Sequence, residues 1–244
     1  MPSLHKKMSQ NTNLLEDLRI ECRKQIIQYP PKKSIKKEII SIAKKAAITL
    51  YTGKQHMTDR FFWPNALLAN ALEISHKRYN DIKDLEALVK YYNKWIEKGA
   101  KFNALDNAMN AYALLYLNEI CPQENYEKTI EKAISYIVSH PKDKAGSLPY
   151  RNDDSNNILI DSLGMICPLL CRYGDSRQNV EAVDIASQQL NNFFEFGFDS
   201  KTNLPYHGYN TDKKIKLGII GWGRGVGWLM IGLVVHQLNC FKGN

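Results

Sequence analysis

The sequence is poor in the residues that would mark a disulfide-bonded, metal-binding or membrane protein. Its five cysteines are odd in number and include no CxxC pair, which argues against a disulfide framework and against a cysteine-based metal site. Residues 1–15 are polar, without the apolar core of a signal peptide, and no apolar run approaches the length of a membrane span. We expect a cytoplasmic protein without membrane contact, metal or organic cofactor.

Acidic residues are outnumbered: 33 Lys and Arg against 25 Asp and Glu give a net charge of +8. Many of the lysines between residues 32 and 45 alternate with isoleucines, which is typical of a helix with one solvated and one buried face. No nucleic-acid recognition motif or aromatic–basic stripe accompanies them. We therefore expect no nucleic-acid partner, although a positive field would favour an acidic substrate.

Apolar residues recur at three- and four-residue spacing through most of the chain, which predicts helices. Strand signals are weak, and any strands within 145–151 or 203–210 should be short. Helical hairpins in series form either a solenoid or a closed α/α toroid. We predict an all-α single domain over 1–244, with helices near 13–29, 34–51, 62–78, 82–98, 106–120, 124–140, 160–174, 177–195 and 225–239.

The strongest local signal is the run Gly-Trp-Gly-Arg-Gly-Val-Gly-Trp at 221–228. Alternate glycines let a backbone approach a ligand closely or take positive φ. The indoles of Trp222 and Trp228 offer stacking faces, and the guanidinium fork of Arg224 can hold a carboxylate bidentately. The run has neither the βαβ context of a dinucleotide site nor the Gly-Lys-Ser/Thr of a P-loop.

Two aspartates stand near predicted helix starts, Asp106 in Leu-Asp-Asn-Ala-Met-Asn and Asp161 in Ile-Asp-Ser-Leu-Gly-Met. Aspartate at such a position is commonly an N-cap. Desolvation beside apolar residues would instead suit a carboxyl group to general acid work, whereas hydrogen bonds from helix N–H groups would oppose this. The residues alone leave both interpretations open. The same holds for His207, a lone histidine between Tyr206 and Tyr209 that is either structural or functional.

Taken together, these segments resemble the unsaturated uronyl hydrolases, which are the unsaturated glucuronyl and rhamnogalacturonyl hydrolases of glycoside hydrolase families 88 and 105. The resemblance runs from about Trp63 to the C-terminus, through LDNAMNAYALL, GSLPYR with LIDSLGMICPLL, LPYHGYN and WGRGVGW. It implies an (α/α)6 barrel with the site at one mouth. It also implies an acidic oligosaccharide substrate, made by a polysaccharide lyase, whose 4,5-unsaturated uronyl residue is hydrated at C4=C5.

The resemblance also implies residue roles. Asp161 matches the principal acid/base, and Asp106 matches a second carboxylate that tunes Asp161 or holds the sugar. The remaining matches are residues expected to contact or enclose the substrate: His207, Arg224, Trp228, Trp222, Met165, Tyr206 and Trp63.

Two departures from the family pattern qualify this expectation. Family members continue through further helices after the glycine-rich run, whereas here 16 residues follow Trp228. We therefore expect a barrel that is incomplete at its C-terminus, with the apolar face of an inner helix uncovered. Ile160 and Gly164 also stand where many members have aromatic residues, which predicts a different sugar or weaker activity.

Two other classes of function remain open. One is a non-catalytic relative that binds carbohydrate, and the other is a helical-repeat scaffold for proteins. The scaffold is disfavoured because no fixed repeat period is visible and because it leaves the aromatic and glycine-rich run unexplained. The oligomeric state is not indicated by the sequence.

Overall fold

The computed structural model describes residues 4–28, 39–40, 42–44, 47, 50–51, 63–151 and 156–240. The helix predicted over 34–51 lies largely outside these residues. Within them, no helix is both long enough and apolar enough to cross a membrane. The helices are α1 (Leu4–Gln28), α3 (Trp63–Tyr79), α4 (Ile82–Glu97), α5 (Leu105–Ala108), α6 (Ala111–Ile120), α7 (Glu124–Val138), α8 (Asp161–Arg177), α9 (Val180–Gly197) and α10 (Gly223–Cys240).

The helices form two layers, and their sequences explain which layer each one joins. Helices α4, α7 and α9 have one apolar and one polar face and lie outside, whereas α8 is buried on all sides from Asp161 to Cys171. Along the inner layer α3 contacts α6, α6 contacts α8 and α8 contacts α10. Along the outer layer α1, α4, α7 and α9 contact one another in the same order. This is the double layer of an all-α toroid, and the predicted fold class is confirmed.

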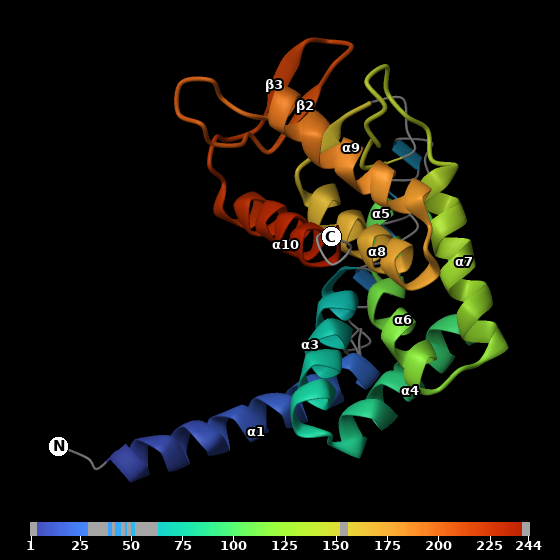
Figure 1. The fold of residues 1–244 in the computed structure, drawn as a ribbon, viewed down its shortest axis with the longest axis vertical. Helices are drawn as coiled ribbons and strands as arrows, with labels where there is room; N and C mark the ends of the chain where they lie inside the picture. Colours follow the sequence, from blue (N-terminus) through green and yellow to red (C-terminus); the bar gives the residue numbers. More distant parts are fainter. Residues whose placement is uncertain are drawn as a thin grey trace.

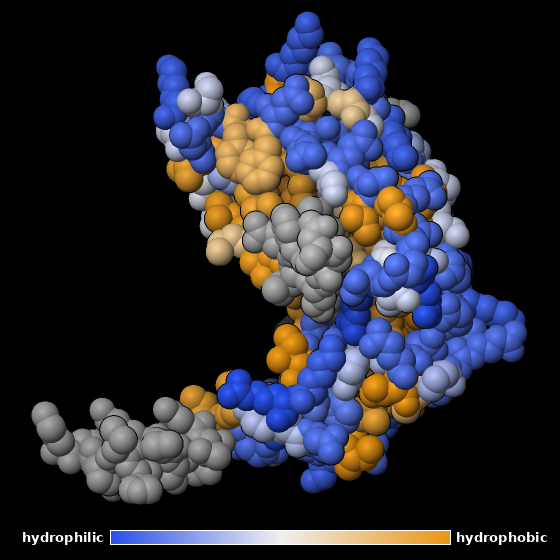
Figure 2. Space-filling model, viewed as in Figure 1, coloured by the Kyte–Doolittle hydropathy of each residue, from blue (hydrophilic) through white to orange (hydrophobic). Residues whose placement is uncertain are grey.

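In Figure 1 the described helices form an arc that is open between α1 and α10. Figure 2 shows apolar surface gathered on the concave side of this arc. Part of that surface belongs to the inner helix α10, where Met230, Ile231 and Val234 are exposed. Exposed apolar residues of α1 lie on the other side of the opening and include Leu15 and Leu18.

The connections determine where a site can form. Short turns join α3 to α4, α6 to α7 and α8 to α9, so each inner helix is antiparallel to the outer helix that follows it. The inner helices therefore run parallel to one another. Their N-terminal ends, and the long connections that lead into them, lie at the same end of the arc.

A three-stranded antiparallel sheet joins two of these long connections. It consists of β1 (Ile158–Leu159), β2 (Gly208–Asn210) and β3 (Ile215–Leu217), in that order. Leu159 pairs with Gly208, and the N–H of Ile160 donates to the carbonyl oxygen of His207 at 2.9 Å. This register places His207 beside the first residue of α8.

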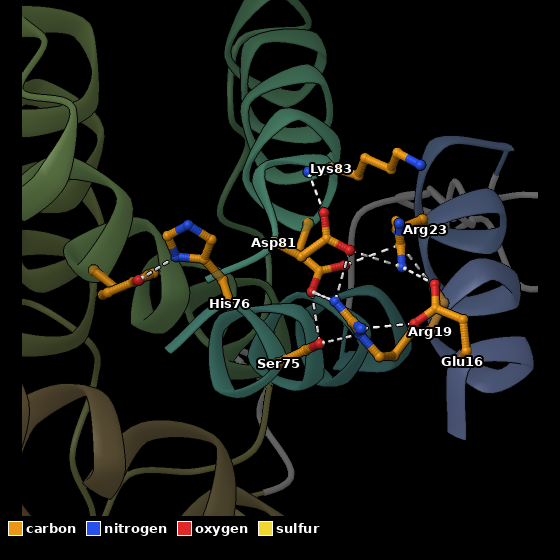
Figure 3. Close-up of polar contacts among 9 residues, drawn as sticks. Glu16, Arg19, Arg23, Ser75, His76, Asp81 and Lys83 are labelled. Atoms are coloured by element: carbon orange, nitrogen blue, oxygen red, sulfur yellow. Dashed lines mark hydrogen bonds and ion pairs between the residues drawn. The ribbon is translucent and has the colours of Figure 1, made fainter. Parts of the chain in front are cut away.

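Charged side chains fasten α1 to the α3–α4 hairpin (Figure 3). The guanidinium of Arg19 lies 2.7 Å from Asp81 and 3.0 Å from Asp84, and Arg23 Nε lies 2.9 Å from Asp84. Ser75 donates its hydroxyl hydrogen to Asp84 at 2.6 Å. Because the Asp84 carboxylate is fully buried, these contacts compensate the loss of its hydration and fix the position of α1.

Candidate active site

The side chains proposed from the sequence cluster at the N-terminal ends of the inner helices. Trp63 is the first residue of α3, Asp106 lies in α5 just before α6, Asp161 opens α8 and Arg224 lies in the first turn of α10. Residues spread over more than half of the sequence therefore meet at one end of the arc. His207 reaches the same place through the pairing of β1 with β2.

Asp161 is the first helical residue of α8, and the N-cap position is occupied by Ile160, which supplies no side-chain cap. The contacts described for the Asp161 carboxylate are with side chains. Its Oδ2 lies 3.1 Å from Nε2 of His207, and its Oδ1 lies 3.9 Å from Nε of Arg224. With only 10% of its side chain exposed, this carboxylate faces a histidine and an arginine in a largely dry setting, which argues against a simple cap.

His207 is held from several directions. Its backbone carbonyl is fixed by Ile160, and its ring meets the indole of Trp222 edge-on, with centroids 4.4 Å apart. Gly218 has φ +72°, and a Cβ there would lie 2.6 Å from Cβ of His207. A side chain at position 218 would therefore both strain the backbone and displace the imidazole.

The glycine-rich run allows the start of α10 to pack closely on the start of α8. A Cβ on Gly225 would lie 2.7 Å from Ile160, so glycine is required for this approach. The guanidinium carbon of Arg224 lies 4.1 Å above the ring of Trp222, a cation–π contact. The Arg224 side chain is nevertheless 58% exposed, so its N–H groups are accessible to a ligand.

Asp106 lies within α5, whose N-cap is Ala104, so it is not a capping residue. The hydroxyl of Tyr150 donates to Oδ2 of Asp106 at 3.4 Å. Burial and the charges of Asp106 and Asp161 raise the pKa of Tyr150. Burial and the charge of Asp106 raise the pKa of Tyr136 to about 12. Tyr150 was not among the site residues predicted from the sequence, although it lies in the segment GSLPYR.

Apolar side chains pack around the first turns of α8, the helix that Asp161 opens. Trp63 and Trp228 meet edge to face with centroids 5.7 Å apart, and both Trp228 and Met165 are buried. Trp228 lies directly against Gly164, where a Cβ would come within 2.6 Å of its indole and of its backbone oxygen. These side chains support the site more than they open onto it.

Tyr206 is not brought to the Asp161 cluster. Its N–H donates to the carbonyl of Gly197, and its hydroxyl donates to Asp199 at 3.4 Å, in the turn that follows α9. Across the part of the chain that the structure describes, no three His, Cys, Asp or Glu side chains are grouped so as to hold a metal ion. The polar side chains that the structure groups at the site carry carboxyl, imidazole, phenol and guanidinium groups.

Solved structures share this fold. A family 105 glycoside hydrolase of C. acetobutylicum ATCC 824 matches with a TM-score of 0.69 at 21% identity, over 81% of this chain and 59% of that one. A possible family 105 member from Klebsiella pneumoniae matches with a TM-score of 0.71 at 16% identity, over 88% and 62%. The unsaturated glucuronyl hydrolase of Bacillus sp. GL1, responsible for glycosaminoglycan degradation, matches with a TM-score of 0.60 at 16% identity, over 78% and 55%. The chain thus spans less than two thirds of the length of these proteins.

No curated protein matches the chain in sequence. The sequence model of Glycosyl Hydrolase Family 88, however, matches residues 33–237, which include all the site residues described above. The resemblance inferred from the motifs is therefore confirmed, and the chain belongs to glycosyl hydrolase family 88.

Proposed function

We propose that this protein is a glycosidase that hydrates the C4=C5 double bond of a 4,5-unsaturated uronyl residue at the non-reducing end of an oligosaccharide. Family membership supports the glycosidase class. The observation that carries the proposal is the setting of Asp161, whose buried carboxylate contacts His207 at 3.1 Å and faces the exposed Arg224 at 3.9 Å. This arrangement groups one acid, one orienting imidazole and one cation that suits an anionic sugar.

Asp161 is the acid and base of the proposed reaction. Its carboxyl group gives a proton to C4 while water adds to C5, and the resulting carboxylate takes up the proton that the water releases. The product at C5 is a hemiketal, which opens and releases the remainder of the oligosaccharide. His207 orients the Asp161 carboxyl group through its Nε2, and general acid–base catalysis of this kind contributes roughly 10²–10⁴ to a rate.

Arg224 is the proposed partner of the uronyl carboxylate. Its guanidinium offers two parallel N–H groups, and stacking on Trp222 holds the plane of the fork. The N-terminal ends of α8 and α10 add partial positive charge at the same mouth, which favours an anionic ring. We assign Asp106 to a sugar hydroxyl or to tuning of Asp161, and we assign Trp63, Trp228 and Met165 to support of the site.

The test is to incubate the purified chain with a lyase-generated unsaturated disaccharide and follow the ultraviolet absorption of its conjugated double bond. We expect this absorption to fall with time, and we expect a saturated uronyl disaccharide to remain uncleaved. Cleavage of the saturated sugar would reject the hydration chemistry. Binding of the unsaturated sugar without loss of absorption would instead favour the non-catalytic, carbohydrate-binding alternative.

A further inference from the structure

The phenol of Tyr150 contacts one of the two carboxylates of the site, which come from different helices. Asp106 belongs to α5 and Asp161 to α8, and the negative charges of both act on the Tyr150 hydroxyl. The hydrogen bond described for this hydroxyl goes to Oδ2 of Asp106 at 3.4 Å. A phenol has a single hydrogen to donate, so it can serve one carboxylate at a time.

Two hydrogen bonds hold the backbone around Tyr150. The N–H of Tyr150 donates to the carbonyl oxygen of Asn157, just ahead of β1. The neighbouring Pro149 carbonyl lies 2.9 Å from Nε2 of the buried His140, which follows α7. Tyr150 is therefore held by the scaffold, and its hydroxyl position relative to Asp106 follows from the fold.

We propose that Tyr150 is a positioning residue of this site, whose hydroxyl donates to Asp106 and holds that carboxylate in place in its ionised form. The inference rests on the proposed function. A hydrogen-bond donor to a carboxylate favours the ionised state of that carboxylate. Tyr150 thus favours the form of Asp106 that can accept a hydrogen bond from a sugar hydroxyl.

Other charged and ionisable groups surround these carboxylates, and His207 and Arg224 lie 3.1 Å and 3.9 Å from Asp161. Tyr136 on α7 senses the charge of Asp106, and Arg151 follows Tyr150 in the chain and opposes the raised pKa of its phenol. His140 stacks edge-on against Tyr136 with centroids 5.4 Å apart. Burial lowers the pKa of His140, so it is a neutral neighbour at ordinary pH.

The kinetic test replaces the hydroxyl alone, with Tyr150→Phe. Loss of one hydrogen bond to a charged group predicts a fall of roughly tenfold to a hundredfold in kcat, with KM changed much less. The acidic limb of the kcat profile should also move to higher pH, because Asp106 then loses a donor that favours its ionised form. The control is Tyr173→Phe, which removes a phenol-to-carboxylate hydrogen bond of 2.8 Å to Glu131 away from the site, and it should leave both kcat and the profile unchanged.

A second measurement does not depend on activity. Nuclear magnetic resonance of protein with carbon-13-labelled tyrosine rings follows the ionisation of Tyr150 in alkaline solution. The Tyr150→Phe variant assigns the resonance. Removing the negative charge with Asp106→Asn should bring its midpoint down towards the ordinary value of a tyrosine, and Asp175→Asn, on the exposed end of α8, should not.

The two measurements separate the possible failures. An unchanged Tyr150 midpoint in Asp106→Asn, or an unchanged kcat profile in Tyr150→Phe, overturns the positioning role. If Asp106→Asn lowers the Tyr150 midpoint but the wild-type protein does not consume unsaturated disaccharide, the pairing of Tyr150 with Asp106 stands. The proposed function is then rejected, and the catalytic consequence of the pairing is rejected with it.

Discussion

Gly164 of α8 lies directly against the backbone of Trp228 of α10. A Cβ at position 164 would come within 2.6 Å of the Trp228 carbonyl oxygen and 3.0 Å of its Cα. Because those atoms belong to the backbone, rotation of a side chain cannot relieve the contact. The packing of α8 against α10 therefore depends on this glycine.

Gly164→Ala should separate α8 from α10 and destabilise the protein by about 2 kcal/mol, the usual cost of overpacking a core. The matched variant is Gly227→Ala, on α10, where a Cβ would meet no atom within 4 Å. Alanine is the better helix former, so that variant should gain roughly 0.5–1 kcal/mol. Urea unfolding of the two variants gives the comparison, and equal effects on stability would show that the contact is not tight.

This packing also explains a departure from the family pattern. Ile160 and Gly164 are smaller than the aromatic residues expected at these positions, which led to the prediction of a different sugar or weaker activity. The structure places Gly164 against Trp228, so Gly164 makes room for α10, and it places Gly225 against Ile160, so Gly225 makes room for that side chain. The small residue at position 164 is accounted for by helix packing, and the effect on sugar choice stays a prediction.

Arg224→Gln should reduce kcat/KM for an unsaturated uronyl disaccharide roughly tenfold to a hundredfold, the value of a hydrogen bond to a charged group. The loss should fall mainly on KM because the fork binds the carboxylate in the ground state as well. Arg224→Lys keeps the charge without the fork and should be intermediate. Arg78→Gln, an exposed arginine at the opposite end of α3, is the control, and an equal loss there would contradict a specific role for Arg224.

Asp84→Ala should destabilise the protein by about 3 kcal/mol or more, because Arg19 and Arg23 would lose a buried partner. The comparison is Glu21→Ala, which removes an exposed ion pair between Glu21 and Lys24 of α1 and should leave stability nearly unchanged. Thermal unfolding measures both variants. A small effect at Asp84 would mean that water can replace the α1 network in Figure 3 with little loss of stability.

Stability should fall in alkaline solution. Burial raises the pKa of Tyr136 to about 12 and that of Cys22 to about 11, each above its ordinary value. A raised pKa favours the protonated group in the folded state. The resulting stabilisation is therefore complete below the group's ordinary pKa and is lost as the pH rises through its pKa in the folded protein. The free energy of unfolding, measured from about pH 8 to about pH 12, should decline, and Tyr136→Phe should flatten the decline. A flat or rising curve in the wild type would contradict the burial of these groups.

Helical periodicity predicted most of the scaffold because each outer helix must present one apolar face to the inner layer. The helix predicted over 106–120 is nevertheless broken between α5 and α6. At the break, the hydroxyl of Tyr92 donates to the Asn110 carbonyl at 2.8 Å, and that of Tyr91 donates to the Asn110 side chain. No local pattern reveals such partners, because they lie on a different helix.

The candidate site likewise combines residues that the sequence predicted with contacts that it could not predict. Motif resemblance selected Asp161, His207 and Arg224, and the structure brings them together. The contact between Asp161 and His207 depends on β1, a strand of two residues that is too short to produce a period-two pattern. The position of Tyr150 against Asp106 depends on the path of a loop, which composition does not specify.

The most direct test of the account compares Asp161→Asn with Asp175→Asn in the disaccharide assay. Both variants remove one carboxylate from α8, but Asp175 is exposed at the far end of the helix. We predict that Asp161→Asn lowers kcat by roughly 10²–10⁴ while Asp175→Asn matches the wild type. Turnover by Asp161→Asn at the wild-type rate would contradict the assignment of Asp161 as the acid and base of this protein.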